Sequence, residues 1–400
     1  MASRALERTS AEAVAEPRYL PFSEPWIGDE EIEAAVACLR SGWLTSGPKV
    51  AELETAFARY VGASHAVAVN SCTSALHLAL EAVGVKPGDE VITSPITFAA
   101  TAAVIEHLGA RPVLVDVEPD TLNLDASLLS DAITPRTKAL LPVHFAGQPC
   151  DMGTVMDVAR AHGLAVVEDA AHALPAAYEG RRVGTIGDIT CFSFYVTKTI
   201  TTGEGGMATT ADGDLAERMR VMRLHGMSKD AWKRYTREGS WFYEITAPGF
   251  KYNLPDLLAA IGLPQLARSD AFLARREAIA RAYDDAFAGL PGVQTPAVEP
   301  GREHAWHLYV IQIDPEAAGM DRDAMIRELA ARGIGTSVHF IPLHLHPYYR
   351  DKYHYRPDDF PRAHAAFRRL VSLPLFAKMT DAEVERVTTA VRDILEAARP

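Results

Sequence analysis

The chain has 400 residues, of which 48% are hydrophobic and 23% are charged, as expected of a soluble globular protein. This length favours two lobes over a single hydrophobic core, and no run of residues is apolar enough to span a membrane. The net charge of −12 argues against a nucleic acid as partner, because a phosphate backbone is bound by positive charge.

The beginning of the chain predicts a tail, two helices and a strand that leads into a third helix. Residues 1–17 lack the apolar segment of a signal peptide, so we expect a disordered tail on a cytoplasmic protein. Apolar residues at helical spacing predict helices over residues 32–39 and 53–60. His65–Val69 is typical of a strand, and the small-residue turn 70–75 leads into another helix. The start of that helix could bind an anion, or Ser71 or Thr73 could simply cap it.

Strands alternate with helices through the middle of the chain. We predict strands at Val91–Thr93, Pro112–Val115, Leu140–Val143 and Leu164–Val167, and helical stretches near Asp125–Ala132 and Asp151–His162. This alternation predicts an α/β fold whose mainly parallel sheet is covered by helices on both faces. Ligands of such sheets bind at the carboxyl ends of the strands.

The remaining sequence predicts a smaller α+β lobe. Residues 226–249 are rich in charged and aromatic side chains and predict an exposed loop that could cover the substrate site. A long helix over Arg268–Leu290 should lead into the second lobe, with strands at 306–310 and 334–340 and a helix from Asp321. Thr380–Glu383 is a capping box that opens the last helix. We therefore divide the chain into a tail (1–17), a large lobe (18–265) and a small C-terminal lobe (266–400).

The cysteines and a cluster of histidines are the places to look for a metal. The four cysteines are far apart with no CxxC pair, which indicates reduced core thiols and neither disulfides nor zinc. His339, His344 and His346 have no carboxylate or cysteine close in sequence to complete a site. We therefore expect no metal.

The residues that indicate chemistry lie between Leu164 and Gly206. An apolar strand stops at Glu168 and Asp169, and Lys198 lies between a second strand and a glycine-rich run. A lysine in such partly desolvated surroundings can lose its proton and act as a nucleophile. Asp169 could face a protonated ring nitrogen, and Ser193 with the small residues could hold a phosphate. Pyridoxal phosphate requires this combination, although a strand cap and a surface lysine would show the same spacing.

Three motifs in this stretch together resemble the DegT/DnrJ/EryC1/StrS family. They are Glu168-Asp169-Ala170-Ala171-His172-Ala173, Phe192-Ser193-Phe194 with Lys198 five residues after the serine, and Gly203-Glu204-Gly205-Gly206. The similarity runs from about Leu20 to the C-terminus in the order of the family. These proteins are pyridoxal-phosphate-dependent sugar aminotransferases of the aspartate aminotransferase fold, so the resemblance implies that fold and that cofactor.

The resemblance also implies roles for individual residues. Lys198 would hold the cofactor as an aldimine and transfer protons, and Asp169 would stabilise the protonated pyridine nitrogen. The other implied cofactor contacts are Thr73, Ser74 and Ser193 at the phosphate, Phe98 stacked on the ring, and His172 near the ring face or its 3-hydroxyl. Asn253 would reach the phosphate of the neighbouring subunit, which implies a homodimer with shared sites. Thr45, Ser46 and His339 would contact the sugar.

By resemblance, the amino donor is L-glutamate, which leaves as 2-oxoglutarate, and the acceptor is a keto group of a nucleotide-linked sugar in ping-pong kinetics. The segments Gly249–Leu254, His304–Leu308 and Arg332–Phe340 are most similar to enzymes that act at C4, the UDP-4-amino-4-deoxy-L-arabinose branch being nearest. Ile341–His346 departs from that branch.

Three alternatives remain open at this point. A keto-cyclitol (inosose-type) aminotransferase would keep every cofactor residue. A sugar dehydratase of the same fold would have histidine in place of Lys198. A non-catalytic regulator would have no use for Asp169, Ser193 and Lys198 together, and the chain has no basic DNA-binding segment.

Overall fold

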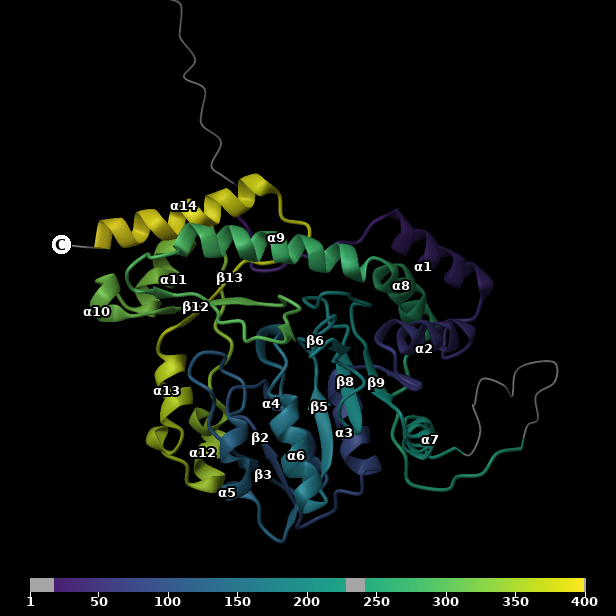
Figure 1. Ribbon diagram of the computed structural model, residues 1–400. Coiled ribbons are helices and arrows are strands. Elements are labelled where there is room, and N and C mark those ends of the chain that lie inside the picture. The colour runs from purple at the N-terminus through teal and green to yellow at the C-terminus, as the bar shows by residue number, and fades with distance from the viewer. Residues whose placement is uncertain (1–17, 228–241, 399–400) are drawn as a thin grey trace, which may run out of the picture.

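The computed structural model describes residues 18–227 and 242–398, with a seven-stranded sheet at its centre (Figure 1). The strand order is β1-β9-β8-β5-β4-β2-β3. The strands are β1 His65–Val69, β2 Glu90–Thr93, β3 Arg111–Leu114, β4 Thr137–Leu141, β5 Ala165–Asp169, β8 Ile189–Ser193 and β9 Gly206–Thr210. The strands from β3 to β8 in this order run parallel, and β9 runs antiparallel to β1 and β8. The predicted mainly parallel sheet is therefore confirmed.

The register of the strands brings several chain segments to one edge of the sheet. β5 ends at Asp169 and β8 ends at Ser193. Because β9 runs the other way, its first residue, Gly206, lies opposite Ser193 on one side and opposite Val69 on the other. This edge is where the carboxyl ends of the parallel strands meet, and such an edge is the usual ligand site in α/β sheets.

Helices cover both faces of the sheet, and the pleat assigns each strand residue to one face. α3 (Cys72–Ala82), α4 (Ala99–His107) and α7 (Gly213–Met222) pack in one apolar cluster with Val167. The short helices η1 (Ala126–Leu128) and α5 (Leu129–Ala132) and the longer α6 (Met152–His162) pack in another with Val166. Since side chains alternate along a strand, Asp169 belongs to the α3–α4 face and Glu168 to the α6 face.

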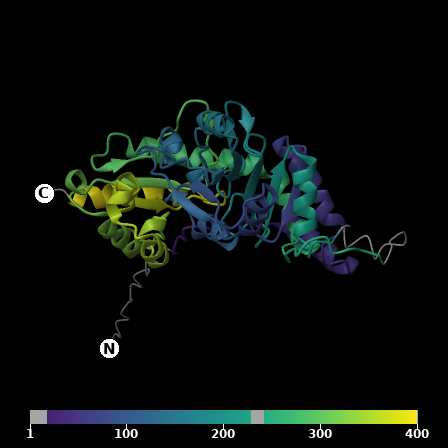
Figure 2. The same ribbon diagram turned by 90° about the horizontal axis from the view of Figure 1, so that it is seen from below.

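The N-terminal helices and the C-terminal lobe lie at opposite ends of the molecule (Figures 1 and 2). At one end, α1 (Asp29–Ser41) and α2 (Pro48–Val61) pack on α8 (Asp256–Ala267). At the other end, the antiparallel sheet β10-β12-β13 packs with helices around a second core. Its elements are α9 Ser269–Phe287, β10 Val293–Gln294, β12 Tyr309–Ile313, α10 Pro315–Ala318, α11 Arg322–Ala331, β13 Leu370–Leu373 and α14 Asp381–Ala398.

Two segments pack in a different lobe from the one to which the sequence-based division assigns them. Leu20 pairs with Ile334 and packs in the C-terminal core, so the start of the expected large lobe lies with the small one. Conversely, Tyr349 and Ala363 belong to the expected small lobe but pack with Ile96 of the large lobe. They come from a short helical region comprising η4 Leu343–Leu345, α12 Pro347–Tyr353, η5 Pro357–Asp359 and α13 Pro361–Phe367. The boundary after residue 265 stays a prediction.

A third small sheet and a tight turn lie between the two lobes. The sheet has the order β11-β6-β7 and consists of β6 Ala177–Tyr178, β7 Arg181–Arg182 and β11 Arg302–Glu303. The turn is the short helix η2, Phe145–Gly147, which follows β4.

The predicted strand over residues 334–340 is wrong. Ile334 and Ser337 make single bridges to Leu20 and Ser372, and β13 occupies the place beside β12. Alternating apolar residues indicate an extended, half-buried segment, but they do not indicate which strand that segment pairs with. The predicted capping box is confirmed: Thr380 N donates to Glu383 Oε2 at 2.8 Å and Glu383 N donates to Thr380 Oγ1 at 3.2 Å.

No helix within residues 18–227 and 242–398 is long and apolar enough to cross a membrane. The expected tail at residues 1–17 and residues 228–241 of the expected loop lie outside the described residues. Both expectations therefore stay predictions.

The close approach of β9 to the start of α3 gives a test of the fold. A Cβ on Gly206 would lie 2.5 Å from the carbonyl carbon of Ser71 and 2.6 Å from the backbone nitrogen of Cys72. Backbone atoms cannot rotate away, so Gly206→Ala should destabilise the protein by about 1–3 kcal/mol in urea unfolding. Gly213→Ala is the control, because its Cβ would meet His65 Nε2 at an ordinary 3.5 Å. Equal stability of the two variants would contradict this reading.

Candidate active site

Lys198 lies in the loop after β8, which folds back on the strand. Its backbone nitrogen donates to the Tyr195 carbonyl at 2.9 Å, and Thr202 N donates to the Phe194 carbonyl at 3.0 Å. Burial lowers the pKa of the Lys198 amine to about 8, while Cys72 and Asp169 oppose the shift. An amine with this pKa is partly unprotonated near neutral pH and can act as a nucleophile.

Asp169 is a buried carboxylate held by neutral donors. Thr101 Oγ1 on α4 donates to Asp169 Oδ2 at 2.8 Å, and Ala171 N donates to Oδ1 at 3.1 Å. Burial raises the pKa of the Asp169 carboxyl above its ordinary value, and these two hydrogen bonds and the charge of Lys198 only partly oppose the rise. A cation placed against this carboxylate would favour its charged form.

A column of rings runs from Lys198 to Phe98. His307 Nε2 lies 3.4 Å from Lys198 Nζ, and the ring centroids of His307 and His172 are 4.4 Å apart. His172 stacks on Phe340 at 5.8 Å, and Phe340 lies 6.3 Å from Phe98. Phe98 is 65% exposed at the start of α4, so it offers an apolar face to a flat ligand.

The start of α3 lies at the same sheet edge. Ser71 caps the helix by accepting from Ser74 N at 3.1 Å, which confirms the capping alternative. The buried Ser74 hydroxyl donates to Asn70 Oδ1 at 2.6 Å, and Thr73 is exposed. Capping by Ser71 satisfies one N–H of the first turn, and the others with the positive helix end can still bind an anion.

Thr45, Ser46 and Asn253 lie together in a separate group. Asn253 Nδ2 donates to Ser46 Oγ at 2.7 Å, and the Thr45 carbonyl accepts from Asp256 N at 3.3 Å. Asn253 also bridges to Val69 of the same chain. These contacts fix the three residues relative to one another, and the expected sugar contacts of Thr45 and Ser46 stay predictions.

His339 lies beside the ring column. Its ring centroid is 5.0 Å from that of Phe340, and its Nδ1 is 2.8 Å from Ser372 Oγ. Burial lowers its pKa to about 4, and the charge of Lys198 adds to the shift. Among the described residues, no group of three His, Cys, Asp or Glu side chains could hold a metal ion.

Three residues of this arrangement were not singled out from the sequence. They are Thr101, which bonds Asp169, His307, which faces Lys198, and Phe340, which stacks on His172. Thr97 and Thr101 recur at helical spacing in an Ala-rich stretch, and this polar pair was the available signal. His307 and Phe340 come from the distant C-terminal half, and no local pattern links them to Lys198.

The residues present fit pyridoxal phosphate. His172 Nδ1 is buried and has no hydrogen-bond partner among the described residues, so a ligand hydroxyl could satisfy it. Asp169 has the raised pKa of a carboxylate that lacks a full ionic partner. Phe98 exposes its ring, and Ser74 and Ser193 lie at a helix start and a strand end, where an anion could bind. These features match the ring hydroxyl, ring nitrogen, ring face and phosphate of that cofactor.

Comparison with known proteins agrees with this reading. The profile of the DegT/DnrJ/EryC1/StrS aminotransferase family matches residues 25–392. The chain is 55% identical over 381 residues to the spore coat polysaccharide biosynthesis protein SpsC of Bacillus subtilis (strain 168), covering 95% of this chain and 98% of SpsC.

Solved structures show the same similarity. The candidate sugar aminotransferase Spr1654 of Streptococcus pneumoniae in its PMP form is 37% identical with a TM-score of 0.88, covering 95% of this chain and 100% of that one. DesI in the presence of its TDP-sugar product is 32% identical with a TM-score of 0.84, covering 94% and 93%. The chain therefore belongs to the DegT/DnrJ/EryC1/StrS family, and it is a pyridoxal-phosphate-dependent sugar aminotransferase.

Proposed function

We propose that this enzyme transfers an amino group from L-glutamate to the C4 keto group of a nucleotide-linked keto-sugar, by ping-pong kinetics in the cytoplasm. The observation that carries the proposal is the placement of a lysine with a lowered pKa and a buried aspartate at one sheet edge. The similarity to DesI, whose structure was determined in the presence of its TDP-sugar product, supports a nucleotide-linked acceptor. The motif resemblances at residues 249–254, 304–308 and 332–340 support C4, and the L-arabinose branch stays a prediction.

The cofactor would be held by Ser74, Thr73 and Ser193 at its phosphate, Phe98 and His172 at its ring, and Asp169 at its ring nitrogen. When bound, pyridoxal phosphate withdraws electrons from the substrate carbon and carries the amino group between the two substrates. Lys198 would hold the cofactor through its unprotonated amine, and as a free amine it would take a proton from the substrate carbon and return it. Asp169 keeps a positive charge on a facing nitrogen because a buried ion pair is stronger than an exposed one.

A second copy of the chain is part of the proposal. On α1, Ile32 and Leu39 are spaced by seven residues, and their side chains are 54% and 53% exposed. Trp26 and Leu44, at either end of α1, are 42% and 46% exposed. An apolar surface that the chain itself does not cover supports a partner subunit. In such a dimer, Asn253 would serve the phosphate site of the partner.

The role of Asp169 can be tested with an isosteric change. Asp169→Asn keeps the side-chain shape and one of the two acceptor oxygens but removes the charge, so the fold should persist while the half-reaction with glutamate slows at least about a hundredfold. Stopped-flow absorbance of the cofactor measures this rate. Asp188→Asn is the control, because that carboxylate accepts from Val166 N at 2.7 Å at the far end of the strand. A normal rate in Asp169→Asn would show that the carboxylate only ends the strand.

The substrate proposal is tested by screening the purified enzyme. The enzyme is incubated with glutamate and a panel of keto-sugar nucleotides, and the products are identified by mass spectrometry. We expect amination of a nucleotide-linked 4-keto-sugar. Keto-inositols belong in the same panel, because a cyclitol aminotransferase would keep every cofactor residue. Turnover of a keto-inositol without turnover of any sugar nucleotide would reject the proposed acceptor.

The shared site is tested with mixed dimers of two inactive variants. Lys198→Ala removes the nucleophile, and Asn253→Glu places a negative charge against the phosphate. If each site combines Lys198 of one chain with Asn253 of the other, a mixed dimer keeps one intact site. Random pairing makes about half of the dimers mixed, so roughly a quarter of the unaltered activity should return after the two are unfolded and reassociated together. Absence of recovery, with subunit exchange demonstrated, would place both residues of a site in one chain.

A further inference from the structure

His307 is in direct contact with the amine that this enzyme uses, and it comes from the other lobe. Its Nε2 lies 3.4 Å from Lys198 Nζ. The imidazole is 5% exposed, and its Nδ1 has no hydrogen-bond partner among the described residues. A buried polar ring without a second partner is uncommon in native proteins and calls for an explanation.

The segment that carries His307 is strained. Trp306 has φ 49°, and Ala146, in the turn that faces it, has φ 56°. Neither is glycine, so both occupy a left-handed conformation that side chains disfavour. Gly147 has φ 109°, and a Cβ there would lie 2.9 Å from the His172 carbonyl and 3.1 Å from His307 N. Strain of this kind persists only where surrounding contacts enforce it.

Backbone hydrogen bonds enforce this conformation from two sides. Ala305 N donates to the Gly147 carbonyl at 2.9 Å, and Leu308 N donates to the Ala146 carbonyl at 3.1 Å. From α9, the buried Arg276 donates through Nη1 to the carbonyls of Trp306 and His307 at 3.0 and 3.3 Å. The segment 304–308 is therefore fixed against both the large sheet and the long helix.

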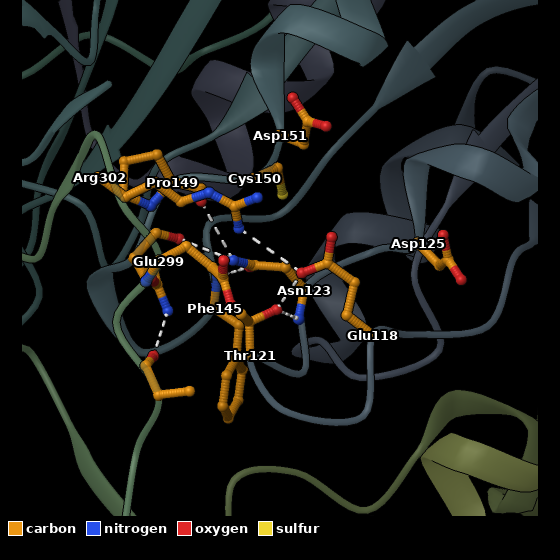
Figure 3. A network of polar contacts seen from close by, with 12 residues as sticks. Glu118, Thr121, Asn123, Asp125, Phe145, Pro149, Cys150, Asp151, Glu299 and Arg302 are labelled. Atoms are coloured by element: carbon orange, nitrogen blue, oxygen red, sulfur yellow. Dashed lines mark hydrogen bonds and ion pairs between the residues drawn. The ribbon is translucent and has the colours of Figure 1, made fainter. Parts of the chain in front are cut away.

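The turn that holds this segment is itself anchored by a polar network (Figure 3). Asn123 Oδ1 accepts from Phe145 N at 2.9 Å, and Asn123 Nδ2 donates to the carbonyls of Gln148 and Pro149 at 3.1 and 3.2 Å. The Gln148 side chain in turn accepts from Glu299 N at 2.8 Å. Figure 3 shows Asn123 between Phe145 and Pro149, with Glu299 and Arg302 close by. The turn 145–147 is thus held in place independently of His307.

The groups around Lys198 determine the protonation state of the His307 imidazole. They are Cys72, Asp169, His172, His307 and His339 by electrostatic contact, with Glu24 and Arg276 lining a small adjoining cavity. Burial lowers the pKa of His307 well below its ordinary value, and the charge of Lys198 adds to the shift. His307 is therefore neutral, and a neutral imidazole can accept a hydrogen bond from an ammonium without repelling it.

We propose that His307 is a positioning residue of this enzyme, whose neutral imidazole accepts a hydrogen bond from the Lys198 ammonium and fixes the direction in which the amine faces its reaction partner. The strained segment 304–308 and its anchors hold the ring at that distance. A hydrogen bond to the ammonium favours the charged form, so its loss must lower the pKa of Lys198.

The test is a titration of Lys198 in the cofactor-free protein, which does not depend on the identity of the sugar. Competitive acetylation with mass spectrometry of the Lys198 peptide gives the modification rate against pH. The unaltered protein should titrate near pH 8. In His307→Leu the midpoint should fall by about one unit, because a hydrogen bond to a charged group is lost. His307→Gln keeps an acceptor and should restore most of the shift.

Two further variants keep the test decisive. His307→Met replaces His307→Leu if the latter does not fold, as judged by thermal unfolding. His77→Leu removes another buried histidine, which contacts Tyr252 at 3.1 Å, and should leave the Lys198 titration unchanged. An unshifted midpoint in the apolar variants, an equal shift in His307→Gln, or an equal shift in His77→Leu would each overturn the proposal.

Discussion

The active site depends on the burial of the Lys198 amine and the Asp169 carboxylate at the same edge of the large sheet. Burial lowers the pKa of Lys198 and raises the pKa of Asp169, so both shifts favour the uncharged forms. Their nearest partners are neutral: an imidazole nitrogen for Lys198, and a hydroxyl and a backbone amide for Asp169. Groups held in this way keep the capacity to react with a ligand, which is why perturbed pKa values gather at functional sites.

The neighbouring acid on the same strand shows the opposite treatment. Glu168 is buried and accepts from three donors, which are His144 Nε2 at 2.9 Å, Thr190 Oγ1 at 2.6 Å and Gly187 N at 2.8 Å. Cys150 N donates to His144 Nδ1 at 3.1 Å, so the ring proton lies on Nε2 and faces the carboxylate. Burial raises the pKa of Glu168, but these hydrogen bonds more than offset it and the pKa is lowered. Glu168 is therefore satisfied within the protein, and Asp169 remains available.

The sheet edge alone does not make the site, because part of it comes from the second lobe. His307 and Phe340 complete the ring column that begins at His172. They reach it because residues 304–308 bond to the turn after β4, and because Leu343 N donates to the Pro95 carbonyl at 2.9 Å. The two lobes are therefore joined at the backbone beside the reacting groups, and a change in their packing would be felt at Lys198.

The sequence by itself indicated most strands of the large sheet, several of its helices and the residues at its carboxyl edge, but neither β9 nor α7. Apolar runs that end in Asp169 and Ser193 mark strand ends, and this signal is local, so it can be read without knowing the partners of the strands. The capping box at Thr380 is local in the same way. The wrong strand at residues 334–340 shows the limit, because a half-buried extended chain looks the same whether or not it has a partner strand.

Only the tertiary structure decided which distant residues meet the reacting groups. Thr101 reaches Asp169 because α4 packs on the face to which β5 turns that side chain. His307 lies 109 positions after Lys198, and its contact depends on left-handed backbone at Ala146 and Trp306, which no residue preference would suggest. Local sequence patterns indicate which face of a helix or strand is buried. The partner across that surface is set by packing of the whole chain, and for that reason the sequence could identify Lys198 and Asp169 while the structure was needed to find the ring beside the amine.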